Sequence, residues 1–77
     1  MKQQNSSNAS KAYWLSFAVS RYANSKNFTS DFVFPKLLEF GVMEFLDKHY
    51  ETEHLENIIH VIEDMDYILK RNGGSLE

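Results

Sequence analysis

Hydrophobic residues recur every three to four positions along most of the chain, and this spacing predicts helices rather than strands. The last part of the chain shows the pattern most clearly. We expect a helix there that begins after Thr52 as its N-cap and ends at Asn72-Gly73-Gly74. Its expected inner face consists of Leu55, Ile58, Ile59, Val61, Ile62, Met65, Ile68 and Leu69.

Two other segments predict helices of different length. The first helix is expected over residues 11–24, with Ser10 as its N-cap. A short helix is expected over residues 42–49, directly after Gly41. This glycine suits the left-handed residue that commonly ends the preceding helix.

A further main helix is expected over residues 31–40, capped by Thr29 or Ser30. Pro35 shifts its expected start toward Phe34, because proline is tolerated only in the first turn of a helix. The predicted fold class is therefore all-α, a compact small bundle of three main helices plus one short helix.

The domain organisation expected from these segments is simple. Residues 10–72 should form a single helical domain, preceded by a disordered polar tail over residues 1–9. Residues 73–77 should form a disordered C-terminal tail, in which Leu76-Glu77 resembles a cloning remnant.

The composition of the chain indicates its cellular location and how it is stabilised. The chain has 77 residues, no cysteine and 43% hydrophobic residues, so it should fold without disulfides and needs dense helix packing or a partner subunit. Its start lacks the apolar core of a signal peptide, and its apolar runs are too short to span a membrane. A cytoplasmic location is therefore expected.

Charge is divided unevenly along the chain. Residues 1–30 contain four basic side chains and no acidic one, whereas residues 31–69 contain ten acidic and two basic side chains. The two halves should attract each other, either within one chain or between copies. Four scattered cations make a poor track for phosphates, so no nucleic-acid partner is expected.

Aromatic residues are concentrated before Tyr50, and a small bundle can hardly bury them all. Tyr13, Trp14 and Phe17 are the candidates for an exposed aromatic patch that binds a protein partner or a second copy. The alternative is that they complete the core of the monomer. Acidic side chains on the last helix, Glu53, Glu56 and Glu63, should steer a basic partner.

Asp66 falls inside the expected apolar arc of the last helix. A carboxylate there is costly unless it is paired. We expect it to pair with Arg21 or Lys11 and so to fix the last helix against the first.

His54 also falls inside that arc, three residues after Glu51, a spacing found at metal sites of helical bundles. A small metal or enzymatic site around Glu51 and His54 is therefore an alternative. The competing interpretation is a structural histidine hydrogen-bonded to a backbone carbonyl. Nucleophile motifs and glycine-rich phosphate loops are absent from the sequence, so neither catalysis nor a cofactor, metal or small-molecule substrate is expected.

One set of positions is shared with a known family: Phe17 and Tyr22, Ser30 as a helix cap, Gly41-Val42 with Phe45-Leu46, Tyr50 with His54, and Asp64 with Tyr67. In these positions the chain resembles the short bacterial proteins grouped as domain of unknown function 3791. The resemblance implies a small helical fold with no established activity. Members of that family are often encoded beside toxin-like or ADP-ribosyltransferase-like proteins, which implies an antitoxin-like or accessory role.

The favoured hypothesis is thus a non-catalytic, cytoplasmic helical module for protein–protein interaction. A third hypothesis treats the helices around Gly41 as a DNA-binding helix-turn-helix. Its second helix would present Glu44 and Asp47, which suit a phosphate-lined groove poorly.

Overall fold

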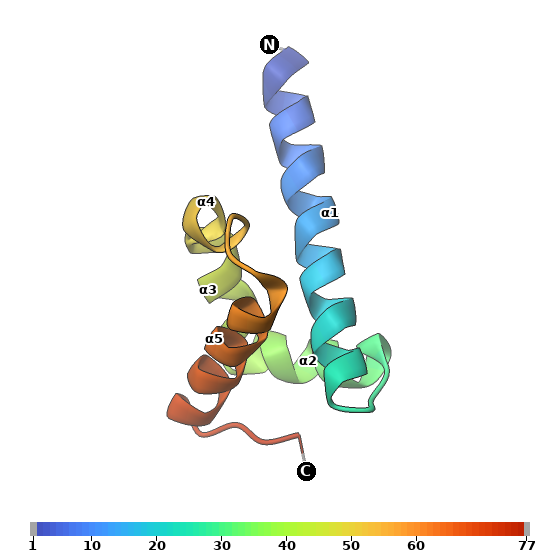
Figure 1. Cartoon of the computed structure of the whole chain (residues 1–77), viewed down its shortest axis with the longest axis vertical. Coiled ribbons are helices and arrows are strands. Elements are labelled where there is room, and N and C mark those ends of the chain that lie inside the picture. Colours follow the sequence, from blue (N-terminus) through green and yellow to red (C-terminus); the bar gives the residue numbers. More distant parts are fainter. Residues whose placement is uncertain (1, 77) are drawn as a thin grey trace.

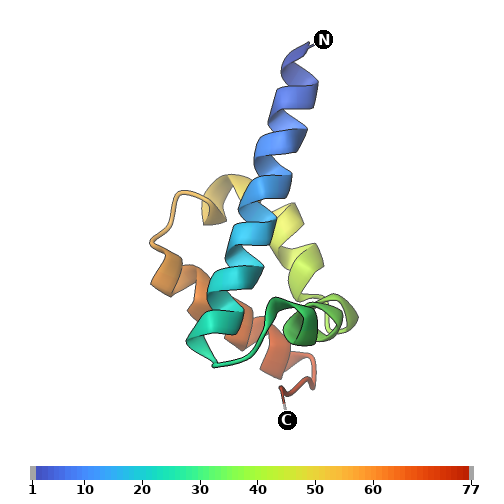
Figure 2. The same cartoon turned by 90° about the vertical axis from the view of Figure 1, so that its right-hand side faces the viewer.

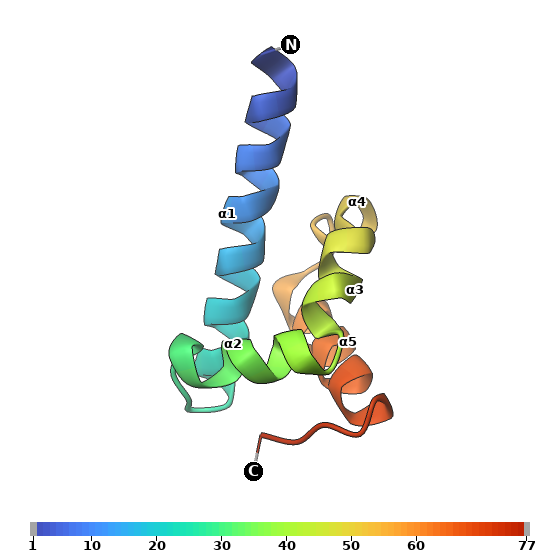
Figure 3. The same ribbon diagram turned by 180° about the vertical axis from the view of Figure 1, so that it is seen from behind.

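The computed structural model describes residues 2–76, with side chains described from residue 9 onward. This part of the chain is all-α, as predicted, and contains no strand. Its helices are α1 (Lys2–Ser25), α2 (Ser30–Glu39), α3 (Val42–Lys48), α4 (Tyr50–Glu53) and α5 (Ile58–Arg71). Helix α2 crosses between the lower end of α1 and α3 (Figure 3), and α5 packs against α1 and α3. No described helix has the length and hydrophobicity needed to traverse a lipid bilayer.

Helix α1 is longer than the sequence predicted, and its N-terminal part projects beyond the other helices (Figures 1 and 2). It begins at Lys2 rather than after Ser10, so it includes residues 2–9, which were expected to be a disordered tail. That segment lacks proline and glycine, and each residue added to an existing helix gains a backbone hydrogen bond without a new nucleation cost. Met1 lies outside the described residues.

The hydrophobic core lies where the C-terminal half of α1 meets α2, α3 and α5. The buried apolar side chains are Ala18, Val19, Tyr22, Ala23, Val33, Leu37, Val42, Leu46, Val61, Met65 and Leu69. The three from α5 are four residues apart, which is one helical turn and the spacing that the sequence pattern predicted.

Helix α2 begins at Ser30, so the expected start near Phe34 is wrong. Thr29 is the N-cap, and its hydroxyl oxygen accepts a hydrogen bond from the backbone N–H of Phe32 at 3.2 Å. The capped first turn also carries Val33 into the core. The Thr29 cap and the packing of Val33 stabilise the helical turn that precedes Pro35. Pro35 itself has no backbone N–H, so the helix lacks one hydrogen bond there.

Gly41 adopts the expected left-handed conformation, with φ of 79°, between α2 and α3. The side chain of Asn72 donates a hydrogen bond to the carbonyl oxygen of Phe40 at 2.7 Å. The end of α5 is therefore tied to the end of α2.

The C-terminal segment follows α5 in a Schellman motif rather than as a free tail. Gly73 is left-handed, and the N–H of Gly74 donates to the carbonyl oxygen of Leu69 at 2.8 Å. Leu76, which resembled a cloning remnant in the sequence, packs against the core. Glu77 lies outside the described residues.

The last predicted helix is interrupted. Its expected cap, Thr52, lies within the single turn of α4, and α5 starts only after Asn57, whose side-chain oxygen accepts from the N–H of Ile59 at 2.9 Å. Leu55 lies in the intervening turn and is 79% exposed, and Ile59 is 61% exposed. These two residues were expected in the inner face, and that expectation is wrong. Leu55 is exposed because the chain breaks before α5, whereas Ile59 lies two residues before Val61 and therefore on a different side of α5.

Candidate functional site

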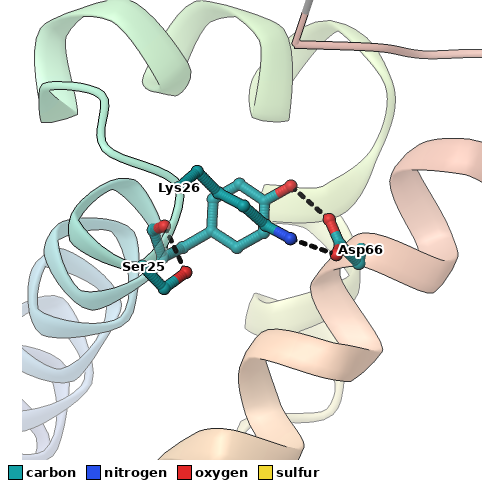
Figure 4. A network of polar contacts seen from close by, with 4 residues as sticks. Ser25, Lys26 and Asp66 are labelled. Atoms are coloured by element: carbon teal, nitrogen blue, oxygen red, sulfur yellow. Dashed lines mark hydrogen bonds and ion pairs between the residues drawn. The ribbon is translucent and has the colours of Figure 1, made fainter.

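Asp66 forms the main polar connection between α1 and α5 (Figure 4). The hydroxyl of Tyr22 donates to Asp66 Oδ1 at 2.6 Å, and the ammonium group of Lys26 is hydrogen-bonded to Oδ2. Lys26 follows the last residue of α1 and lies one helical turn after Tyr22, so both reach the same carboxylate. Asp66 therefore fixes α5 against α1, as expected, but through a different cation.

The two cations expected to pair with Asp66 lie elsewhere. The guanidinium of Arg21 lies over the ring of Phe17, 5.6 Å from its centroid. The ammonium of Lys11 pairs with Asp47 at 2.8 Å. Both partner assignments for Asp66 were wrong, because the rotation of α1 about its axis turns Tyr22 toward α5 and Arg21 toward solvent.

The pKa values in this network move in opposite directions. Burial would raise the pKa of Asp66, but hydrogen bonds from Lys26 and Tyr22, together with the positive charge of Lys26, outweigh it and lower that pKa. Burial, followed by the hydrogen bond to Asp66 and its negative charge, raises the pKa of Tyr22. Asp66 is thus ionised and Tyr22 neutral near pH 7, so the neutral hydroxyl donates to a charged carboxylate.

The three aromatic residues expected to form one patch lie on two sides of α1. Tyr13 is 78% exposed and Phe17 is 45% exposed, and the two are one helical turn apart. Trp14 is half-buried and packs edge-on against the ring of Tyr50, with centroids 5.6 Å apart. Trp14 therefore helps to complete the monomer, and the exposed pair is Tyr13 and Phe17.

Glu53 is not part of an exposed acidic face, contrary to expectation. Its side chain is only 6% exposed, and its Oε1 has no hydrogen-bond partner among the described residues. Burial, and then the neighbouring carboxylates of Asp64 and Glu56, raise its pKa to about 7. Glu56 and Glu63 are exposed, so the acidic face that was expected to attract a basic partner consists of these two residues without Glu53.

His54 lies at the end of α4 with its Nδ1 2.7 Å from the carbonyl oxygen of Tyr50. Its ring stacks on that of Tyr50 with centroids 4.3 Å apart. This arrangement supplies the backbone hydrogen bond of the structural interpretation, but the side chain is exposed. Glu51 is also exposed, and the described residues contain no group of three or more potential ligands that could hold a metal ion.

An apolar groove between α1, α2 and α3 was not anticipated from the sequence. Figure 3 shows the three helices that line it, and its volume is about 970 Å³. Its lining residues are Ala12, Leu15, Ser16, Val19, Ser30, Asp31, Phe34, Pro35, Leu38, Met43, Glu44 and Asp47. A signal for it exists in the sequence: Phe34 and Leu38 lie one helical turn apart on the side of α2 that carries neither Val33 nor Leu37.

A family model described as protein of unknown function (DUF3791) matches residues 14–72. The chain belongs to the DUF3791 family. No curated protein and no solved structure matches it. The match confirms the resemblance that the sequence suggested, and the matched region of this DUF3791 protein contains the whole buried core and the Asp66 network.

The helices expected to form a helix-turn-helix, α2 and α3, pack together around Gly41 in this DUF3791 protein. Helix α3 presents Glu44, Asp47 and Lys48 on its exposed side. Asp47 is paired with Lys11 of α1 at 2.8 Å. Glu44 and Lys48 therefore leave this side close to neutral. Among the residues that matched the family, Ser30 is the first helical residue and not the cap.

Proposed function

We propose that this protein is a non-catalytic helical module that binds another protein, or a second copy of itself, through the outer face of α1. The observation that carries the proposal is the outward position of Tyr13 and Phe17 on the side of α1 opposite the core. Exposed aromatic side chains with large contact area are enriched in protein interfaces and are frequent energetic anchors.

The length of α1 supports the same proposal. Its 24 residues span about 36 Å at 1.5 Å per residue, and only its C-terminal half contributes to the core. A polar helix gains little stability from propensity alone, and helices are mainly stabilised by packing of an apolar face. A partner that packs on Tyr13 and Phe17 would supply such packing to the projecting part.

Charge adds a steering element. Glu56 is exposed in the loop before α5 and Glu63 is exposed on α5, whereas the described part of α1 has no acidic side chain. In this proposal the acidic face attracts a partner with a basic surface and chiefly increases the rate of association.

The biological setting is proposed from the family resemblance. A bacterial, cytoplasmic, accessory or antitoxin-like role would suit a small module whose activity is binding alone. Function cannot be transferred from fold, so the binding surface is the part of this proposal to test first.

Site-specific photo-crosslinking in the native host tests the surface. A benzophenone amino acid replaces Phe17 in one variant and Tyr67 in the other. Tyr67 is a matched control because it is an exposed aromatic on α5 with Arg71 over its ring at 5.9 Å, as Arg21 lies over Phe17. We expect a discrete crosslinked species at position 17 that is lost on Tyr13→Ser, and none at position 67. Equal crosslinking at both positions, or none at position 17, contradicts the proposal.

A further inference from the structure

We infer that the groove between α1, α2 and α3 is a second binding site, separate from the Tyr13–Phe17 face, and that it accepts an amphipathic helix of a partner protein carrying lysine or arginine beside its apolar stripe.

The apolar residues that line the groove are spaced so that they can contact the side chains of an inserted helix. Leu15 and Val19 lie one turn apart on α1, and Phe34 and Leu38 lie one turn apart on α2. Met43 of α3 lies at a third side. An inserted helix would place apolar residues at positions i, i+3 or i+4, and i+7 against these side chains.

The exposure of the α2 residues indicates a surface that the monomer does not cover. Phe34 is 42% exposed and Leu38 is 56% exposed, although both are large apolar side chains of α2. Contiguous apolar surface of this kind is characteristic of binding grooves.

The charges around the groove decide which helix it fits. Among the described residues, its charged lining residues are Asp31, Glu44 and Asp47, and none is a lysine or arginine. Lys11 neutralises Asp47 from the end of the groove at 2.8 Å. Asp31 and Glu44 have no ion-pair partner among residues 9–76, so they are free to pair with cations of an incoming helix.

Other occupants fit the same groove less well. Nucleic acid and acidic peptides would place negative charge next to carboxylates, which is repulsive. A second copy could insert its α1, whose described side chains include Lys11 and Arg21, and the experiment below separates this case.

NMR titration of the full-length, ¹⁵N-labelled protein tests the inference. The probe is a synthetic helical peptide of about 14 residues with leucine on one face and lysine on the other, and its counterpart carries glutamate in place of lysine. We expect the lysine peptide to saturate shifts of residues along the groove, with affinity falling at least about tenfold in high salt. The glutamate peptide should cause no saturable shift.

Two variants locate the site. Leu38→Ser, at an exposed position, and the pair Asp31→Asn with Glu44→Gln should each weaken binding by about tenfold or more. The matched control is the pair Glu39→Gln with Glu51→Gln, which removes the same charge at exposed positions outside the groove lining and should change affinity less than about twofold. If circular dichroism shows that Leu38→Ser is not folded, the variant with Asp31→Asn and Glu44→Gln is used by itself to locate the site.

Three results would overturn the inference: shifts centred on α5, equal binding of both peptides, or concentration-dependent groove shifts without peptide, which would identify a second copy as the occupant. Photo-crosslinking at position 17 does not involve the groove. Either proposal can therefore fail while the other holds.

Discussion

Asp66 and Glu53 are two carboxylates largely removed from water in the same small domain, yet their surroundings are opposite. Asp66 receives a hydroxyl and an ammonium group from the end of α1, and its pKa is lowered. Glu53 faces Asp64 and has one oxygen without a partner, and its pKa is raised to about 7. Burial penalises both charges, so the neighbours alone decide whether the carboxylate stabilises the fold.

The two carboxylates also lie in regions that should differ in stability against local unfolding. The Asp66 contacts connect residues 40 and 44 positions apart in sequence and thereby hold α1 against α5. Glu53 lies in the single turn of α4, next to the exposed loop over residues 54–57. We expect local opening to begin at α4, because none of the buried apolar side chains of the described core comes from it.

Replacement of Asp66 should have the largest effect. Asp66→Ala leaves the buried hydroxyl of Tyr22 without its acceptor and Lys26 without its counter-ion. We expect a loss of about 2–3 kcal/mol in the free energy of unfolding, measured by urea denaturation at neutral pH. Glu63→Ala on the exposed side of α5 is the control and should change it by less than about 0.5 kcal/mol. Equal effects of the two substitutions would contradict a stabilising role for the network.

Replacement of Glu53 should have a smaller effect of opposite sign. Glu53→Gln removes a buried charge that has no cation beside it in the described structure. At about pH 8 we expect a gain of about 1–2 kcal/mol in the free energy of unfolding, measured by denaturant titration. At about pH 4, where the wild-type carboxyl is already protonated, the two proteins should be nearly equally stable.

The pH dependence of the wild-type protein follows from the same two groups. The folded-state pKa of Glu53 lies above its ordinary value, so its contribution is fully present below about pH 4.5 and is lost as the pH rises through about 7. The folded-state pKa of Asp66 lies below its ordinary value, so its contribution is present above about pH 4 and is lost on further acidification.

The contributions of Glu53 and Asp66 to the pH dependence can be separated by comparing the stability of each variant with that of the wild-type protein at each pH. Stability of the wild-type protein minus that of Glu53→Gln should fall between about pH 4.5 and 7.5, as read from unfolding curves at each pH. Asp66→Ala should leave that fall in place while removing part of the acid sensitivity below about pH 4. A pH-independent difference would show that Glu53 stays ionised in the folded protein.

The sequence sufficed for features that depend on one helix at a time. The four-residue spacing of Val61, Met65 and Leu69 predicted the buried face of α5, and Gly41 predicted the break between α2 and α3. Each of these is a local property, because a helix face follows from periodicity and a left-handed residue follows from the preference of glycine.

Features that depend on two helices could not be obtained in the same way. The partner of Asp66 is set by the rotation of α1 against α5, and Arg21, Lys11 and Lys26 are equally plausible in a linear sequence. The start of α5 was ambiguous for a related reason: Thr52 and Asn57 are both good caps, and only packing selects Asn57. The groove exists only because α1, α2 and α3 diverge, and no single helix encodes that divergence.

Removal of the Tyr22 hydroxyl should have the smallest effect on stability. It also separates the contributions of Tyr22 and Lys26 to the pKa of Asp66. Tyr22→Phe keeps the buried ring. It leaves Lys26 as the one hydrogen-bond partner of Asp66 among the described side chains, with the charge of Lys70 nearby. We expect a loss of about 1 kcal/mol in the free energy of unfolding, and an increase in the pKa of Asp66 seen by carboxyl ¹³C NMR titration. Lys26→Met should raise that pKa as well, and the double variant should raise it furthest and make Asp66 resemble Glu53 in the direction of its shift. If Tyr22→Phe leaves the pKa of Asp66 unchanged, the ammonium group alone accounts for the difference between the two carboxylates.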